Sequence, residues 1–178
     1  MRKKQEGFSL IELLIVVAII LIIAAIAIPN LLRAKIAANQ ASAVGSLRTI
    51  NSAEETFSST YSNGYALTLM QLGGAPGASS CLSAKLIDEV LSAGQKSGYT
   101  YLFQPNGTVA LTAGVPAACG VSGDTGYGVS ATPTTLNSTG TTSFCIDETG
   151  VVRINANGAP IPIAPPLECS GAGFPPLQ

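Results

Sequence analysis

Apolar side chains fill the first part of the chain and then thin into a single stripe. Leu13 to Ile28 is an unbroken apolar run of sixteen residues, and Phe8-Ser9-Leu10-Ile11-Glu12 precedes it. As a helix, the stretch from Phe8 to Ile28 would be about 31 Å long, close to the roughly 30 Å of a hydrocarbon core. We therefore expect a membrane-spanning helix.

A helical pattern resumes after Pro29, which removes one backbone hydrogen bond and is expected to kink the helix. Apolar residues then recur at spacings of three, four or seven, which is typical of a helix with one buried face. They are Leu32, Ile36, Ala43, Leu47, Ile50, Phe57 and Tyr61. One kinked helix from Phe8 to about Thr60 is predicted, and the apolar face of its second half must pack against the C-terminal part of the chain.

The remainder predicts short elements between turn signals. Tyr61-Ser62-Asn63-Gly64-Tyr65 should end the long helix, and Ser83 should cap a short helix over Ala84–Ala93. Leu86, Val90 and the neighbouring Ile87 and Leu91 are expected on its buried side. Strands are expected at Tyr99–Phe103, Thr108–Thr112, Tyr127–Thr132, Ser143–Asp147 and Val151–Asn155, the first two joined through Pro105-Asn106-Gly107 and the last two through Glu148-Thr149-Gly150. The fold class is α+β: a long helical spine, transmembrane in its first half and amphipathic in its second, packed against a small antiparallel sheet.

Six segments follow from this pattern. They are residues 1–7 as a leader, 8–29 as the apolar helix, 30–61 as its amphipathic half, 62–98 as a loop with a short helix, 99–157 as the sheet, and 158–178 as a proline-rich tail.

Four cysteines, Cys81, Cys119, Cys145 and Cys169, follow the apolar segment. An even number beyond a membrane anchor indicates an oxidising compartment and two disulfides. Three pairings remain open, and we weakly prefer Cys81–Cys119 with Cys145–Cys169, the second of which would tie down the tail.

Charge and composition exclude several classes of protein. Arg2-Lys3-Lys4 precede the apolar run, which favours a cytoplasmic N-terminus, and no basic patch of the kind that binds nucleic acid follows. Histidine is absent and no Gly-x-Ser-x-Gly occurs, so we expect no enzyme and no cofactor. The pairs Glu54-Glu55 and Asp88-Glu89 are typical of solvated helix faces; Asp147-Glu148 is expected at a hairpin turn rather than in a metal site.

Glu12 is unusual because it lies near the start of an apolar run. Carboxylates inside membrane segments are costly and usually functional. In a bilayer Glu12 could reach the interface, but among packed helices it would need a cation. The nearest repeating source is the α-amino group of a neighbouring subunit, whereas the simpler alternative is a solvated glutamate without a role.

A cleaved secretory signal peptide is the main alternative for this segment, because Ala25-Ile26-Ala27 resembles its cleavage site. The length of the run, Glu12 within it and the helical pattern that continues afterwards argue against it.

The stretch from Gly7 to Ile20, GFSLIELLIVVAII, together with Ala27-Ile28-Pro29-Asn30, resembles the class III signal sequence of type IV pilins and pseudopilins. The resemblance covers about residues 2–36. It implies that a membrane prepilin peptidase cuts between Gly7 and Phe8 and methylates the new amino group of Phe8. It also implies that this amine pairs with Glu12 of an adjacent subunit, and that the helix bends at Pro29 during assembly.

The resemblance also implies a function. The chain would be the structural subunit of a type IV pilus, a homopolymer assembled by an inner-membrane platform and its ATPase and used for adhesion, motility or DNA uptake. Before assembly it would lie in the inner membrane with a cytoplasmic N-terminus, and afterwards in an extracellular filament. The alternative is a pseudopilin of a type II secretion system, whose major forms carry an acidic calcium loop that the tail lacks. A bitopic receptor would leave Glu12 unexplained.

Overall fold

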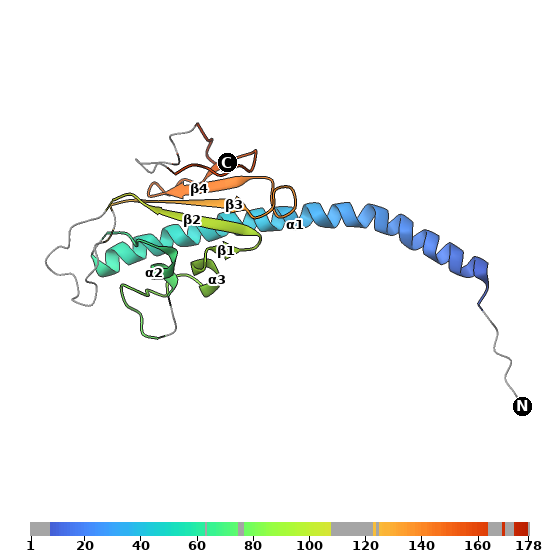
Figure 1. The fold of residues 1–178 in the computed structure, drawn as a ribbon, viewed down its shortest axis with the longest axis horizontal. Coiled ribbons are helices and arrows are strands. Elements are labelled where there is room, and N and C mark those ends of the chain that lie inside the picture. The colour runs from blue at the N-terminus through green and yellow to red at the C-terminus, as the bar shows by residue number, and fades with distance from the viewer. Residues whose placement is uncertain are drawn as a thin grey trace, which may run out of the picture. The chain divides into compact units, whose positions relative to one another are not determined.

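The computed structural model describes residues 8–62, 64–74, 77–107, 123, 125–163, 169 and 173–177 (Figure 1). The chain divides into two compact units, residues 1–35 and residues 36–178. In the first unit the described residues from Leu10 onward are helical, and the second unit holds the sheet and the core of the fold.

Helix α1, Leu10–Tyr61, is 52 residues long and continues through Pro29. It ends at Tyr61, as predicted, and Ser62 follows with a positive φ of 50°. From Ala43 onward one face is buried, as the predicted stripe requires, whereas Leu32 stays 46% exposed. The buried positions are Ala43, Ser46, Leu47, Ile50, Ala53, Glu54 and Phe57.

A five-stranded antiparallel sheet covers that face of α1, with its strands in chain order (Figure 1). Its strands are β1 (Gln95–Lys96), β2 (Tyr99–Pro105), β3 (Tyr127–Pro133), β4 (Ser143–Asp147) and β5 (Arg153–Asn155). The predicted α+β architecture is therefore confirmed.

The two faces of the sheet are buried by different partners. Tyr99, Tyr127 and Phe144 lie on the inner face, in one core with the buried residues of α1. On the outer face Cys145 packs with residues of the proline-rich tail, among them Ile161 and Cys169. Because both faces are covered there, every residue of β4 is buried.

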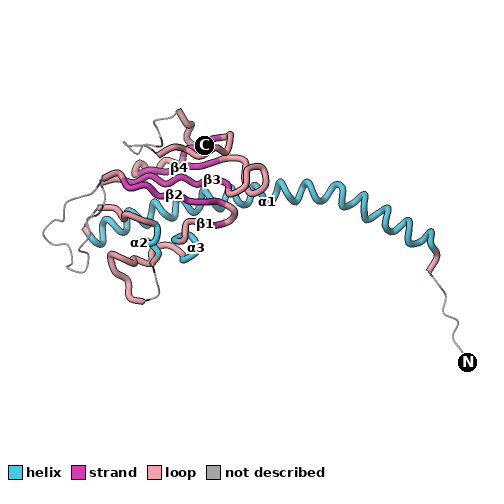
Figure 2. Tube along the Cα trace, in the orientation of Figure 1, coloured by secondary structure: helices cyan, strands magenta, loops and turns pink. Residues whose placement is uncertain are grey.

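The segment between α1 and the sheet differs from its prediction. Helix α2, Leu69–Gly73, was not predicted, and the helix expected over Ala84–Ala93 is only α3, Glu89–Ser92 (Figure 2). Asp88 rather than Ser83 caps α3, accepting a hydrogen bond from the Leu91 amide at 2.9 Å.

Non-local backbone bonds explain the shorter helix. The amides of Ala84, Lys85 and Leu86 donate to the carbonyls of Gln71, Gly73 and Leu72 at 2.8, 3.1 and 2.8 Å, so this stretch is not helical. Val90, predicted to be buried, is 58% exposed.

The strand predictions are correct for β2, β3 and β4, and β5 begins two residues later than expected. The predicted strand Thr108–Thr112 lies outside the described residues. Past the end of β2, the chain pairs with the residues just before β3. The Asn106 amide donates to the Gly126 carbonyl and the Thr125 amide to the Gly107 carbonyl, both at 2.9 Å. The predicted turn between β4 and β5 is confirmed by their antiparallel pairing and by the Gly150 amide, which donates to Asp147 at 2.9 Å.

Candidate assembly site

The start of α1 brings together Phe8 and Glu12, which the sequence singles out, with Ser9 between them. Phe8 is 79% exposed, Ser9 directly precedes the helix, and Glu12 lies in its first turn. Gly7 lies outside the described residues. The Ser9 amide donates a hydrogen bond to Glu12 Oε2 at 3.0 Å.

This hydrogen bond is one half of a capping box. In a Ser-x-x-Glu sequence, the glutamate at the third helical position accepts the amide hydrogen of the residue that caps the helix. Glu12 therefore fixes where α1 begins and leaves Phe8 outside the helix. The sequence already carried this signal, because Ser9-Leu10-Ile11-Glu12 precedes an apolar run.

The charge of Glu12 has no cation nearby in the described part of the chain. There, the one ion pair joins Lys96 and Asp88 at 2.7 Å, and both lie far along the sequence. A carboxylate that leaves water needs a compensating positive charge. That charge has to come from the undescribed N-terminal residues or from another molecule.

The apolar side chains that follow Glu12 are uncovered. Leu13, Ile20 and Ile28 are 58%, 58% and 66% exposed. A helix that is apolar all round is normally surrounded by lipid or by other helices. The helix is long and apolar enough to cross a membrane, with a mean hydropathy of 3.3 over its most apolar window.

Residues 2–28 match the family described as the prokaryotic N-terminal methylation motif. The type IV major pilin protein PilA of Myxococcus xanthus (strain DK1622) is 46% identical over 54 residues, which are 30% of this chain and 24% of that protein. In its N-terminal segment, this chain is similar to type IV pilins. The chain thus spans about a quarter of the length of the curated relative it matches. No solved structure gives a significant match.

Phe8 and Glu12 lie within the matched motif, and Pro29 directly follows it. Phe8 precedes α1 by two residues, Glu12 lies in its first turn, and Pro29 lies further along α1. The roles of these residues in processing and assembly are not decided by their positions, so they remain proposals.

The predicted disulfide between Cys145 and Cys169 is confirmed, with a Cα–Cα distance of 5.9 Å. Cys81 is also disulfide-bonded. Its predicted partner Cys119 lies outside the described residues, so that pairing stays a prediction.

Asp147 stabilises the same region of the second unit, residues 36–178, which we call the head. It is 1% exposed and lies at the turn where it was predicted. Its Oδ1 accepts hydrogen bonds from the amide and hydroxyl of Thr149, and its Oδ2 accepts one from the Cys169 amide at 3.0 Å. Within the described residues no group of three or more acidic, cysteine or histidine side chains could hold a metal. This carboxylate is therefore used by the fold.

Glu54 contradicts its prediction as a solvated residue. It is fully buried, and its Oε2 accepts a hydrogen bond from the Ala66 amide at 2.8 Å. Glu55, the next residue, is exposed as predicted. Sequence reasoning missed Glu54 because its partner lies beyond the end of α1.

Titratable side chains in the head serve packing. Burial raises the pKa of Tyr99 to about 12, and burial together with the nearby Glu54 and Glu55 carboxylates raises the pKa of Tyr127. The Lys96 ammonium donates a hydrogen bond to Asp88 and thereby lowers the pKa of that exposed carboxyl group.

Proposed function

We propose that this chain is the structural subunit of a type IV pilus. The observation that carries the proposal is the uncovered apolar helix that begins at the Glu12 capping box, within the matched methylation motif. Such a helix suits storage in a membrane and then transfer into the core of a homopolymer. The similarity of the N-terminal segment to a major pilin supports this proposal.

Processing would come first. A prepilin peptidase would hydrolyse the amide bond between Gly7 and Phe8, which frees an amino group on Phe8, and would then methylate it. The methylated amine still binds a proton and carries a positive charge. It would therefore supply the cation that Glu12 lacks in the described part of the chain.

Assembly would then pair the Phe8 amine of one subunit with Glu12 of its neighbour. The inner-membrane platform and its ATPase would move the helix from lipid into the filament, with Pro29 as the place where it bends. The single-pass orientation, with a cytoplasmic N-terminus, belongs to the same proposal. Adhesion, surface motility and DNA uptake are the uses that such a filament would serve.

Two measurements test the proposal. Mass spectrometry of the mature chain is expected to show an N-terminus at methylated Phe8, and a start at Ile28 would instead identify a cleaved signal peptide. Electron microscopy of sheared cell-surface material is expected to show long filaments that contain this chain. Their absence together with a secretion defect would assign the chain to a type II secretion pseudopilus.

A further inference from the structure

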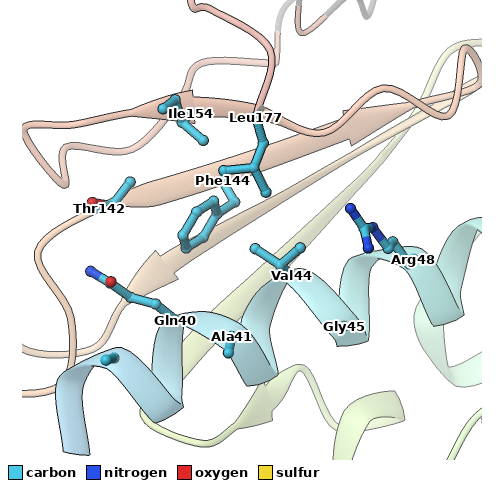
Figure 3. Close-up of a pocket in the computed structure, with 10 residues that line it drawn as sticks. Gln40, Ala41, Val44, Gly45, Arg48, Thr142, Phe144, Ile154 and Leu177 are labelled. Carbon is cyan, nitrogen blue, oxygen red and sulfur yellow. The ribbon is translucent and has the colours of Figure 1, made fainter. Parts of the chain in front are cut away.

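A groove of about 630 Å³ lies between α1 and the far edge of the sheet (Figure 3). Its floor is α1 from Ala37 to Arg48, and Phe144, Ile154 and Leu177 form the opposite wall. We call this the helix–sheet groove. Its lining is mostly apolar, with Arg48 at one end (Figure 3).

Small residues of α1 form the floor of the groove and leave open space above it. Ala37, Ala41 and Gly45 recur one helical turn apart, and a Cβ atom added to Gly45 would meet nothing within 4 Å. Glycine is among the poorest helix formers, and packing within this head does not require it here. A molecule that approaches the groove from outside would explain its presence.

Arg48 gives the groove a charge. It is exposed and forms no ion pair within the residues that the structure describes. An occupant with large apolar side chains and a nearby carboxylate would match both the cavity and this guanidinium.

The same head carries a surface of that kind. Met70 and Leu82 are 63% and 56% exposed, and both line one shallow hollow beside α2. We call these two residues the α2 patch. Glu89, next to Val90, is exposed and forms no ion pair in the described part of the chain.

The groove and the α2 patch lie at opposite edges of the sheet. Helix α3 leads directly into β1 at one edge, and α2 packs against α3, whereas the groove adjoins β4 and β5 at the other edge (Figures 1 and 2). Different complementary surfaces on one molecule make head-to-tail contacts, which extend into filaments when they do not close into rings.

We propose that the helix–sheet groove binds the α2 patch of a second copy of this chain. Met70 and Leu82 fill the apolar cavity above Gly45, and Glu89 lies toward Arg48. The contact rests on the proposed function, because it presupposes a homopolymer. It adds a contact between neighbouring heads to the pairing of the N-terminal helices.

Cross-linking in assembled filaments tests this contact. In the full chain with Gly45→Cys and Met70→Cys, a short bis-maleimide is expected to produce a ladder of dimers, trimers and higher oligomers. The cysteines in the described part of the chain are already disulfide-bonded, so the introduced thiols are the reactive pair. The matched control joins Gly45→Cys with Leu102→Cys, because Leu102 is 54% exposed on the outer face of β2.

A second variant separates the interface from folding. Gly45→Leu fills the groove floor but replaces a poor helix former with a good one, so the thermal midpoint of the solubilised chain is expected to stay equal or rise. Filament yield is expected to fall about tenfold, the effect of one weakened contact. Ser52→Leu, on an exposed position of α1 outside the groove, is the control.

The outcomes are distinct. Filaments without the ladder, an equal ladder in the Leu102 control, cross-links to a different protein, or normal filament yield in Gly45→Leu would each overturn the contact and leave the pilus proposal standing. Failure of the unsubstituted chain to enter any filament would overturn the proposed function itself.

Discussion

At the scale of single residues, Glu12 has two separable properties. Its carboxylate oxygen accepts the hydrogen bond of the Ser9 amide and so caps the helix, and its negative charge requires a nearby cation when the helix leaves water. Glutamine retains a hydrogen-bond acceptor and also serves in capping boxes, but it carries no charge. Substitution can therefore distinguish the cap from the ion pair.

We expect Glu12→Ala and Glu12→Gln to insert into the membrane normally and to lose filament assembly. Only Glu12→Ala removes the cap, so only it is expected to fray the first turn of α1. Membrane fractionation, filament yield and backbone amide exchange near Ser9 measure these three effects. Normal filament yield in Glu12→Gln would show that the charge is not required.

Glu54 gives a second prediction at this scale. Glu54→Leu is expected to destabilise the chain by about 1–3 kcal/mol, because it leaves the buried Ala66 amide without this acceptor. Glu54→Gln, which keeps an oxygen, should cost less, and Glu55→Leu on the exposed neighbouring position is the matched control. Thermal unfolding of the detergent-solubilised chain measures the difference; equal midpoints for Glu54→Leu and Glu55→Leu would contradict it.

At the scale of elements, the Cys145–Cys169 disulfide holds the tail against β4. It closes a sequence separation of 24 residues, for which the chain-entropy account gives about 3 kcal/mol. The double variant Cys145→Ser, Cys169→Ser is expected to unfold at a correspondingly lower temperature and to become sensitive to proteolysis after residue 158. If the thermal midpoint and the proteolysis pattern stayed unchanged, Asp147 and the packing on the outer face of the sheet would be sufficient to hold the tail.

Patterns of side chains along the sequence predicted the elements whose contacts are regular. The stripe of Ala43, Leu47, Ile50 and Phe57 identified the buried face of α1, and the runs between turn signals identified β3 and β4 closely. They failed between α1 and the sheet, where the amides of Ala84–Leu86 bind carbonyls more than ten residues away. A local helical pattern carries no information about such a partner.

The same difference between local and distant contacts applies to the functional residues. Phe8 and Glu12 were identified because their chemistry lies within five consecutive residues. The helix–sheet groove was not, because it joins α1 to residues about a hundred positions further along the chain. The burial of Glu54 was hidden for the same reason.

At the scale of the whole molecule, buried tyrosines link stability to alkaline pH. Burial raises the pKa of Tyr99 to about 12 and also raises the pKa of Tyr101 and Tyr127, against 10.0 for an exposed tyrosine. These phenols stay neutral in the folded chain while the unfolded chain ionises. Their contribution is therefore complete below pH 10 and is lost as the pH rises from about 10 through 12.

The expected result is a constant thermal midpoint up to about pH 10 and a steep fall above it. Unfolding at increasing pH, followed together with phenolate absorbance, measures both events. Tyr99→Phe removes one of the ionising groups and is expected to make the fall shallower, although it also removes the hydrogen bond to Thr142 O. A fall that began well below pH 10 would require a different group.

The C-terminal residues 175–177 affect how the heads behave when they are packed closely together. Ile154 N–H donates to Pro175 O at 3.0 Å and Leu177 N–H to Val152 O at 2.8 Å, so residues 175–177 occupy the open side of β5. Pro175 and Pro176 have no N–H to offer to a further strand. An exposed sheet edge invites aggregation, and at this edge Pro175 and Pro176 cannot donate the hydrogen bonds that a further strand needs. Heads held at high density are thereby less prone to fuse through this edge of their sheets.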